Sequence, residues 1–181
     1  MGNASDSIPS RLARGEPVDV VILARPALDQ LVADGKVVPG SQVDLVRSSI
    51  GMAVRKGTPK PDISTLEALK HTLLAAPSIA YSASASGTYY ETEMLKNLGI
   101  EAQVKPKSRR ILSERVGTVV ARGDAELGLQ QVSELLPIEG IDFIGVLPPE
   151  VQRVTVFSAG ISTTARESEA ARALIRYFTS P

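Results

Sequence analysis

Short apolar runs alternate with helix-like stretches along most of this chain, and no other feature restricts its fold as strongly. The run "VDVVILA" (18–24) is continuous and rich in β-branched residues, and "SIAYS" (78–82) is a shorter run. Runs of this length predict buried strands. Because strands and helices follow each other in turn, the sequence predicts an α/β fold with a mainly parallel sheet.

Capping residues and glycines locate the helix boundaries. Ser5 or Ser7 is expected to cap a short helix that ends at Gly15, and Ser64 with Glu67 three residues later forms a capping box. Further helices are predicted at 26–35, 88–99, 113–124 and 168–181, and further strands at 42–57 (one strand or a pair), 125–131, 141–148 and 153–161.

Composition excludes several classes of function. Lys plus Arg equals Asp plus Glu at 20 each among 181 residues, so bulk charge gives no reason to expect nucleic acid as a partner. The chain has no cysteine and one histidine, His71, which is expected at the surface; a metal site of several Cys or His ligands is therefore excluded. No apolar run approaches the roughly 18 residues that cross a bilayer, and no cofactor-binding motif is present, so neither membrane insertion nor a cofactor is expected.

The stretch "SASASGTYYETE" (82–93) concentrates hydroxyl groups between a predicted strand and a predicted helix. Ligands of α/β sheets bind at the carboxyl ends of strands, and a helix N-terminus favours an anion. Ser84, Ser86, Gly87 and Thr88 are therefore candidate donors to an anion, and an ordinary N-cap in a polar loop is the alternative. The N-terminal "GNASDSIPSRLARG" has the same pattern, and two such helix starts could face each other across a cleft.

Several segments of this chain resemble the molybdate-binding branch of the type 2 periplasmic solute-binding proteins. They are "IPSRLARGEPVDVVI", "LVADGKVVPGSQVDLVRSSIGMAVRKGTPKPDIST", "IAYSASASGTYYETEMLKNLGI" and "VVARGDAELGLQQVSELLP". The resemblance extends over nearly the whole chain. It implies two α/β lobes joined by two crossing segments, with an anion in the cleft between them, and an ABC transporter permease as a possible partner.

The resemblance also implies contacts to the ligand. The serine loop of the family corresponds to Ser5 and Ser7, and backbone donors correspond to Ser86 and to a position near Ser113. Gln131 stands where molybdate binders have a tyrosine, and arginines cluster near Ser113, so a carboxylate is expected in preference to molybdate. The implied ligand-binding residues are Ser5, Ser7, Ser86, Gly87, Thr88, Tyr89, Arg109, Arg110, Ser113, Arg115 and Gln131.

Set beside the family, the chain is expected to be truncated. Relatives begin with a signal peptide, a strand and a helix that have no counterpart here. The first lobe is thus expected at 1–54 plus 154–181 and incomplete, and the second lobe at 55–153. Family members are periplasmic, whereas this chain as written lacks a signal peptide and is expected in the cytoplasm.

Two functions stay open at this point. The first is binding of a small oxyanion or carboxylate as the solute-binding component of an ABC-type transporter. The second is enzymatic, because the pattern "LGLQQVSELLP" (127–137) also resembles aconitate isomerases, which move a proton along an allylic tricarboxylate. Such a reaction requires clamps for carboxylates and a base. Arginines and hydroxyls could supply the clamps, and a serine or Glu114 could act as base only with a strongly shifted pKa.

Overall fold

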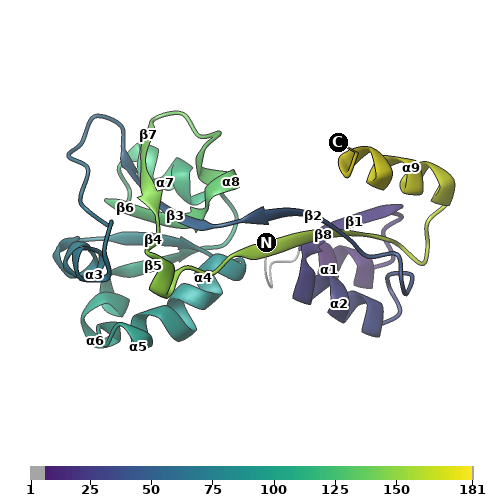
Figure 1. Ribbon diagram of the computed structural model, residues 1–181, viewed down its shortest axis with the longest axis horizontal. Helices are drawn as coiled ribbons and strands as arrows, with labels where there is room; N and C mark the ends of the chain where they lie inside the picture. Colours follow the sequence, from purple (N-terminus) through teal and green to yellow (C-terminus); the bar gives the residue numbers. More distant parts are fainter. Residues whose placement is uncertain (1–6, 181) are drawn as a thin grey trace. The chain divides into compact units, whose positions relative to one another are not determined.

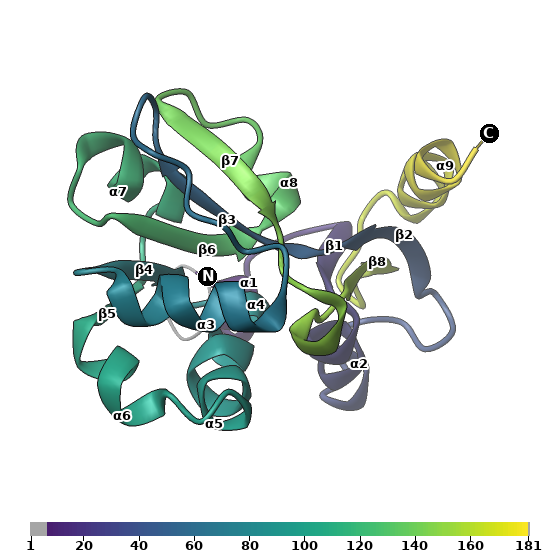
Figure 2. The same cartoon turned by 60° about the vertical axis from the view of Figure 1, so that its left-hand side comes forward.

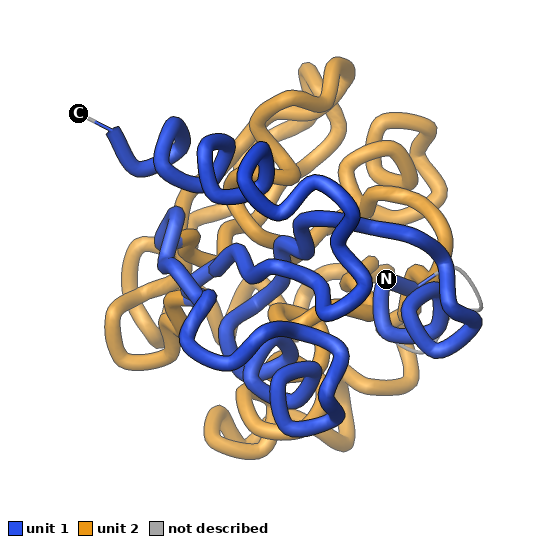
Figure 3. Tube along the Cα trace, turned by 90° about the vertical axis from the view of Figure 1, so that its right-hand side faces the viewer, with its two compact units in different colours: residues 1, 3–47, 155–181 blue, residues 2, 48–154 orange. Residues whose placement is uncertain are grey.

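The computed structural model describes residues 7–180, which fold into two compact units. Unit 1 comprises residues 7–47 and 155–180, and unit 2 comprises residues 48–154 (Figure 3). Each unit has its own sheet. The chain thus enters unit 1, forms unit 2 as one uninterrupted stretch, and returns to unit 1.

Unit 1 is a three-stranded sheet with helices on both faces (Figure 1). Leu12, Val21, Leu28, Leu31 and Val37 form the core under α1 and α2, and a smaller cluster lies under α9. Its strands, in spatial order, are β1 (Val20–Ala24), β8 (Thr155–Ile161) and β2 (Val43–Ser48), and its helices are α1 (Ile8–Ala13), α2 (Arg25–Ala33) and α9 (Ser168–Phe178).

β1 differs from the buried parallel strand that its sequence predicts. It lies at the end of the sheet order and pairs antiparallel with β8, from Val20 opposite Ile161 to Ala24 opposite Phe157. Val21 is its one buried residue. A continuous apolar run indicates a strand, but it does not reveal which partner the strand finds far along the chain. The prediction of a mainly parallel sheet is therefore wrong for unit 1.

Unit 2 contains a five-stranded mixed sheet. β4 pairs in parallel with both β5 and β6, whereas β3 is antiparallel to β6 and to β7. The parallel prediction thus holds only for the three neighbouring strands β5, β4 and β6. The strands in spatial order are β5 (Ser108–Ile111), β4 (Ile79–Ser82), β6 (Leu127–Gln131), β3 (Ile50–Arg55) and β7 (Ile141–Val146).

Side-chain alternation along β4 explains why helices cover both faces of the unit 2 sheet (Figure 2). Ile79 and Tyr81 belong to the large core beside α3 and the helix after β4, whereas Ala80 joins a smaller core under α7. No helix within residues 7–180 is long and apolar enough to cross a membrane. The helical elements are α3 (Leu66–Ala75), α4 (Ala85–Tyr89), the π-helical η1 (Tyr90–Met94), α5 (Leu95–Asn97), α6 (Glu101–Val104), η2 (Lys105–Lys107), α7 (Val116–Arg122), α8 (Val132–Leu135) and η3 (Pro149–Val151).

Two predicted helix starts need correction. The N-cap of α3 is Thr65, whose hydroxyl accepts from the Ala68 amide at 3.1 Å; the Ser64 amide instead donates to the Asp62 carboxylate at 2.8 Å. The helix predicted from residue 88 starts at Ala85 and continues without interruption through α4, η1 and α5. Each start is shifted because a neighbouring hydroxyl residue takes the extended N-cap conformation.

Candidate functional site

Three parallel strands of unit 2 end at the same edge of the sheet, which we call the carboxyl edge. Ser82 at the end of β4 is level with Ile111 at the end of β5, and Tyr81 is level with Leu129 two residues before the end of β6. A helix begins within five residues of each strand end, at Ala85, Val116 and Val132. Ligands of α/β sheets bind at such an edge.

A cluster of serine hydroxyls occupies the turn between β4 and α4. The Ser82 hydroxyl lies 2.8 Å from that of Ser84 and 3.0 Å from that of Ser86. Ser84 takes the N-cap position but makes no side-chain cap hydrogen bond. The first-turn amides are therefore not capped by the N-cap side chain, and they remain suited to an anionic ligand.

Gly87 allows α4 to pack directly against the end of β4. A Cβ atom at this position would lie 1.6 Å from the backbone oxygen of Ser82. Backbone atoms cannot retreat as the end of a side chain can, so every other residue would displace the helix. The sequence pattern singles out Gly87 as a donor, and the structure adds that its missing side chain sets the height of the helix above the strand.

A second polar cluster links β6, α7 and α8 at the carboxyl edge. The buried Gln130 side chain accepts from the Val116 amide at 3.0 Å through Oε1, and its Nε2 donates to the Glu134 carboxylate. Glu134 is half-buried, and this burial raises the pKa of its carboxyl, opposed in part by the charge of Arg115 and the bond from Gln130. The sequence analysis missed Gln130 and Glu134. Their only signal is two amides at a strand end with a carboxylate four residues beyond the first.

The remaining predicted residues on the helix after β4 have different surroundings. Thr88 is exposed, and its amide donates to the Ser84 carbonyl within the helix. Tyr89 is buried; its hydroxyl donates to the Val151 carbonyl at 3.0 Å, and the guanidinium of Arg153 lies 4.2 Å from the centre of its ring. The Tyr89 hydroxyl is thus engaged in fixing the helix against the 149–153 segment.

The predicted arginines do not form one cluster. Arg109 and Arg110 are exposed on β5, and Arg110 lies 3.9 Å from Glu91. Arg115 occupies the N-cap position of α7 and is exposed, as is Ser113 in the preceding loop. Of these three arginines, Arg115 is the one whose positive charge lowers the pKa of the Glu134 carboxyl.

Gln131 and Ser7 belong to different units. Gln131 is the last residue of β6 and is 1% exposed, so its side chain belongs to the interior of unit 2. Ser7, in unit 1, caps α1 by accepting from the Ser10 amide at 3.3 Å, as its sequence predicts. Ser5 lies outside the described residues.

Glu114 is not suited to act as a base. Its two carboxylate oxygens bind the Arg122 guanidinium at 2.7 and 3.0 Å. These bonds hold the pKa of Glu114 below its usual value, which is the opposite of the shift that a base requires.

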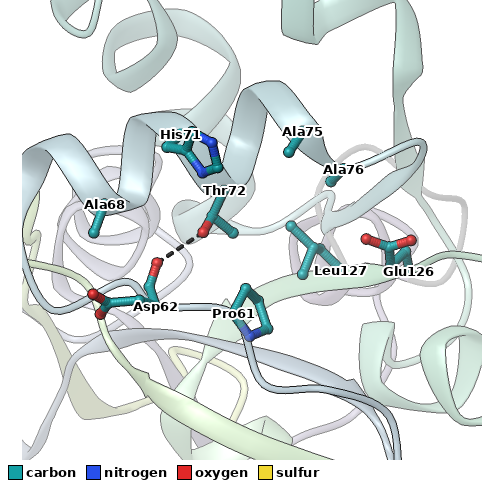
Figure 4. Close-up of a pocket in the computed structure, with 9 residues that line it drawn as sticks. All are labelled: Pro61, Asp62, Ala68, His71, Thr72, Ala75, Ala76, Glu126 and Leu127. Atoms are coloured by element: carbon teal, nitrogen blue, oxygen red, sulfur yellow. Dashed lines mark hydrogen bonds between the residues drawn. The ribbon is translucent and has the colours of Figure 1, made fainter.

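The opposite edge of the sheet has a pocket beside α3 (Figure 4). His71 lies on α3 at this pocket and is exposed, which confirms its predicted surface position, and Thr72 donates to the Asp62 carbonyl at 2.7 Å. Leu127 marks the amino end of β6, so the pocket lies away from the carboxyl edge. Residues 7–180 contain no group of three or more His, Cys, Asp or Glu side chains placed to hold a metal ion.

These features define a two-lobed α/β fold of the periplasmic-binding-protein type. One lobe is continuous in sequence, and the other is built from the two chain segments that flank it. The chain belongs to the bacterial extracellular solute-binding proteins, because the model of that family matches residues 1–181.

Several known proteins are similar to this chain. An aconitate isomerase from a Pseudomonas species is 48% identical over 180 residues, which cover 99% of this chain and 69% of that protein. The Azotobacter vinelandii periplasmic molybdate-binding protein superposes with a TM-score of 0.72 at 19% identity, covering 95% of this chain and 76% of its own. The tungstate ABC transporter structure from Geobacter sulfurreducens gives a TM-score of 0.70 at 19% identity, with coverages of 94% and 76%. The two solved structures establish the similarity of fold alone.

Proposed function

We propose that this protein binds a small carboxylate at the carboxyl edge of unit 2. The observation that carries the proposal is the serine cluster at the start of the uninterrupted helical segment 85–97. There, the hydroxyls of Ser84 and Ser86 are both hydrogen-bonded to that of Ser82, and the N-cap side chain leaves the first-turn amides uncapped. Amides and hydroxyls arranged in this way donate hydrogen bonds to an anion, and the helix dipole adds a favourable partial charge.

The ligand we infer is a di- or tricarboxylate. The support is chemical: the exposed Arg115 guanidinium begins α7 at the same edge, and a guanidinium binds a carboxylate through two parallel hydrogen bonds. The similarity of 48% to a protein named aconitate isomerase also favours a tricarboxylate over molybdate or tungstate. In the transport version of this function, the protein delivers its ligand to an ABC-type permease, and the family's description as extracellular solute-binding proteins supports the binding step.

The second candidate function is isomerisation of aconitate, and the same relative favours it. Aconitate carries a methylene group next to its double bond. Removal of one methylene proton gives an allylic anion, and return of the proton to the other terminal carbon shifts the double bond. The protein would have to hold the carboxylates and supply one base.

Calorimetry and NMR separate these functions on the 181-residue chain. Calorimetric titrations with cis-aconitate, trans-aconitate, the saturated analogue tricarballylate and molybdate identify the ligand class, and we expect a carboxylate to bind most tightly. Proton NMR of each aconitate isomer with the protein then detects conversion. Binding of molybdate with no response to any carboxylate would contradict the proposal.

A further inference from the structure

The carboxylates near the carboxyl edge of unit 2 differ in how they are neutralised. Glu114 binds Arg122, Glu93 binds Arg153 through both oxygens, and Glu91 lies 3.9 Å from Arg110. Glu134 forms no ion pair with any residue of the described range 7–180. A carboxylate without an ion pair is the stronger candidate for accepting a proton.

The orientation of Glu134 is fixed at one oxygen only. Its Oε2 accepts a hydrogen bond from Gln130, and the other end of the Gln130 amide is held by the Val116 backbone. Because Gln130 is 3% exposed, this relay of two hydrogen bonds, from the Val116 amide to Gln130 and from Gln130 to Glu134, is anchored in the interior of the unit. Oε1 of Glu134 accepts no hydrogen bond from residues 7–180 and can take up a proton. The anchored oxygen orients the carboxylate, and the available oxygen can accept a proton, as a general base must.

Burial strengthens this base. Half-burial raises the pKa of the Glu134 carboxyl, because removal of water disfavours its charged form. A base whose pKa lies closer to neutrality accepts a proton from carbon more readily. Arg115 supplies positive charge nearby without a direct ion pair, so it can bind a substrate carboxylate and leave Glu134 available.

We propose that Glu134 is the catalytic base that moves the proton of an allylic tricarboxylate. The inference rests on the isomerase candidate among the proposed functions. The Glu134 carboxylate takes a proton from the methylene carbon, so that a C–H bond breaks, an O–H bond forms and the electron pair spreads over the three-carbon allyl system. The resulting carboxylic acid returns the proton to the other terminal carbon. Atoms and electrons balance without a further reactant.

Glu134→Gln tests this role on the full chain, because the amide keeps the acceptor for Gln130 and removes the basic oxygen. We expect kcat for aconitate isomerisation to fall about 10²–10⁴-fold, with the Kd for tricarballylate changed less than about threefold. Incorporation of solvent deuterium into the methylene group of aconitate, followed by NMR, should stop as well. Glu134→Asp keeps a carboxylate and should restore part of both signals. Glu126→Gln, at the exposed amino end of β6, is the matched control and should leave all signals unchanged.

Each outcome decides between the proposals. Isomerisation within threefold of wild type in folded Glu134→Gln overturns the role of Glu134, and so does loss of tricarballylate binding in that variant, which would assign Glu134 to ligand binding. If Glu134→Gln is unfolded by circular dichroism, the comparison moves to Glu134→Ala, which also lacks the carboxylate and where turnover within threefold of wild type overturns the role. A wild-type chain that binds tricarballylate but neither isomerises nor exchanges overturns this inference and the isomerase candidate, while carboxylate binding stands. A wild-type chain that binds no carboxylate overturns the proposed function too.

Discussion

The two units of this protein differ in the size of their hydrophobic cores. Unit 2 has a main core of 20 buried residues, and its inner strand β4 is buried along its whole length. Unit 1 has clusters of five and four buried residues, and its strand β1 has a single buried residue. Buried apolar area is the main favourable contribution to stability, so unit 2 should be the more stable of the two.

The polar contacts differ in the same direction. In unit 1, Asp19 accepts from the Arg166 and Glu167 amides, and Asp44 accepts from the Ser158 hydroxyl at 2.6 Å and the Arg25 guanidinium at 2.8 Å. These carboxylates join chain segments that are far apart in sequence. Unit 2 has such exposed contacts as well, between Arg153 and Glu93, and adds buried hydrogen bonds of amides and hydroxyls. Exposed ion pairs, which solvent and salt weaken, occur in both units, so the buried hydrogen bonds are what distinguishes unit 2.

The largest effect we predict is a difference in hydrogen exchange between the units. Amides of 78–82 and 126–131 should be strongly protected and amides of 18–24 weakly protected, with opening free energies that differ by about 5 kcal/mol. Exchange followed by mass spectrometry with peptide resolution measures this. Equally strong protection of both regions in a monomer would remove the contrast between the units.

Glycine substitutions should destabilise the two units by different amounts, and this is the next largest effect that we predict. In unit 2, Gly87→Ala places a Cβ 1.6 Å from a backbone oxygen, and we expect a loss of about 3 kcal/mol in the free energy of unfolding. In unit 1, Gly160→Ala meets side-chain ends of Val37 at 2.7 Å and Leu28 at 3.2 Å, which can move, so about 1 kcal/mol is expected. Urea denaturation measures both, and equal losses would contradict the distinction between backbone and side-chain neighbours.

A proline substitution tests the serine cluster with a smaller effect. Ser86→Pro in the first turn of α4 removes one amide donor, at a position where helices tolerate proline. Carboxylate binding should weaken by about 1–3 kcal/mol, measured by calorimetry. Ser86→Ala removes the hydroxyl and keeps the amide, so it separates the two donors. Unchanged affinity in folded Ser86→Pro would leave this turn with a capping role only.

The smallest predicted effect is a difference in pH response. Hydrogen bonds from the Glu167 and Arg166 amides lower the pKa of Asp19 below its usual 3.8. The stability that Asp19 contributes is therefore present above pH 3.8 and is lost as the pH falls through its lower folded-state pKa. Burial raises the pKa of Glu134 above 4.5, so acidification toward pH 4.5 should stabilise unit 2 slightly. Thermal unfolding of Asp19→Asn between pH 7 and pH 3 should lack part of the acid sensitivity of the wild type.

Local sequence patterns predicted most of the helices and strands because caps, glycines and apolar periodicity act over a few residues. β5 was missed since "SRRI" has no apolar pattern of its own, and it is a strand only because β4 pairs with it. The antiparallel partner of β1 could not be predicted either, because Val20 pairs with Ile161 across the whole of unit 2. Contacts between distant segments are set by packing and leave little trace in the local sequence.

The candidate site likewise has a part that the local sequence predicted and a part that depends on packing between elements. Ser86 and Gly87 follow a strand and begin a helix, so their position at the carboxyl edge was predictable. The relay of Val116, Gln130 and Glu134 joins α7, β6 and α8, and no spacing in the sequence indicates that these elements are neighbours. The suggestion of Glu114 as a base was wrong for the same reason, because its binding to Arg122 depends on the turn before α7 and on the last residue of that helix.

The pairing of β1 with β8 also sets an order of events during synthesis. Val20 pairs with Ile161, which is synthesised 141 residues later, so the hydrogen bonds between β1 and β8 cannot form before then. At about 5–20 residues per second on the ribosome, this delay lasts on the order of ten seconds. Meanwhile all of unit 2 leaves the exit tunnel and can fold. The backbone of β1 remains unpaired with β8 during this interval, so chaperones that recognise extended apolar segments should engage residues 18–24.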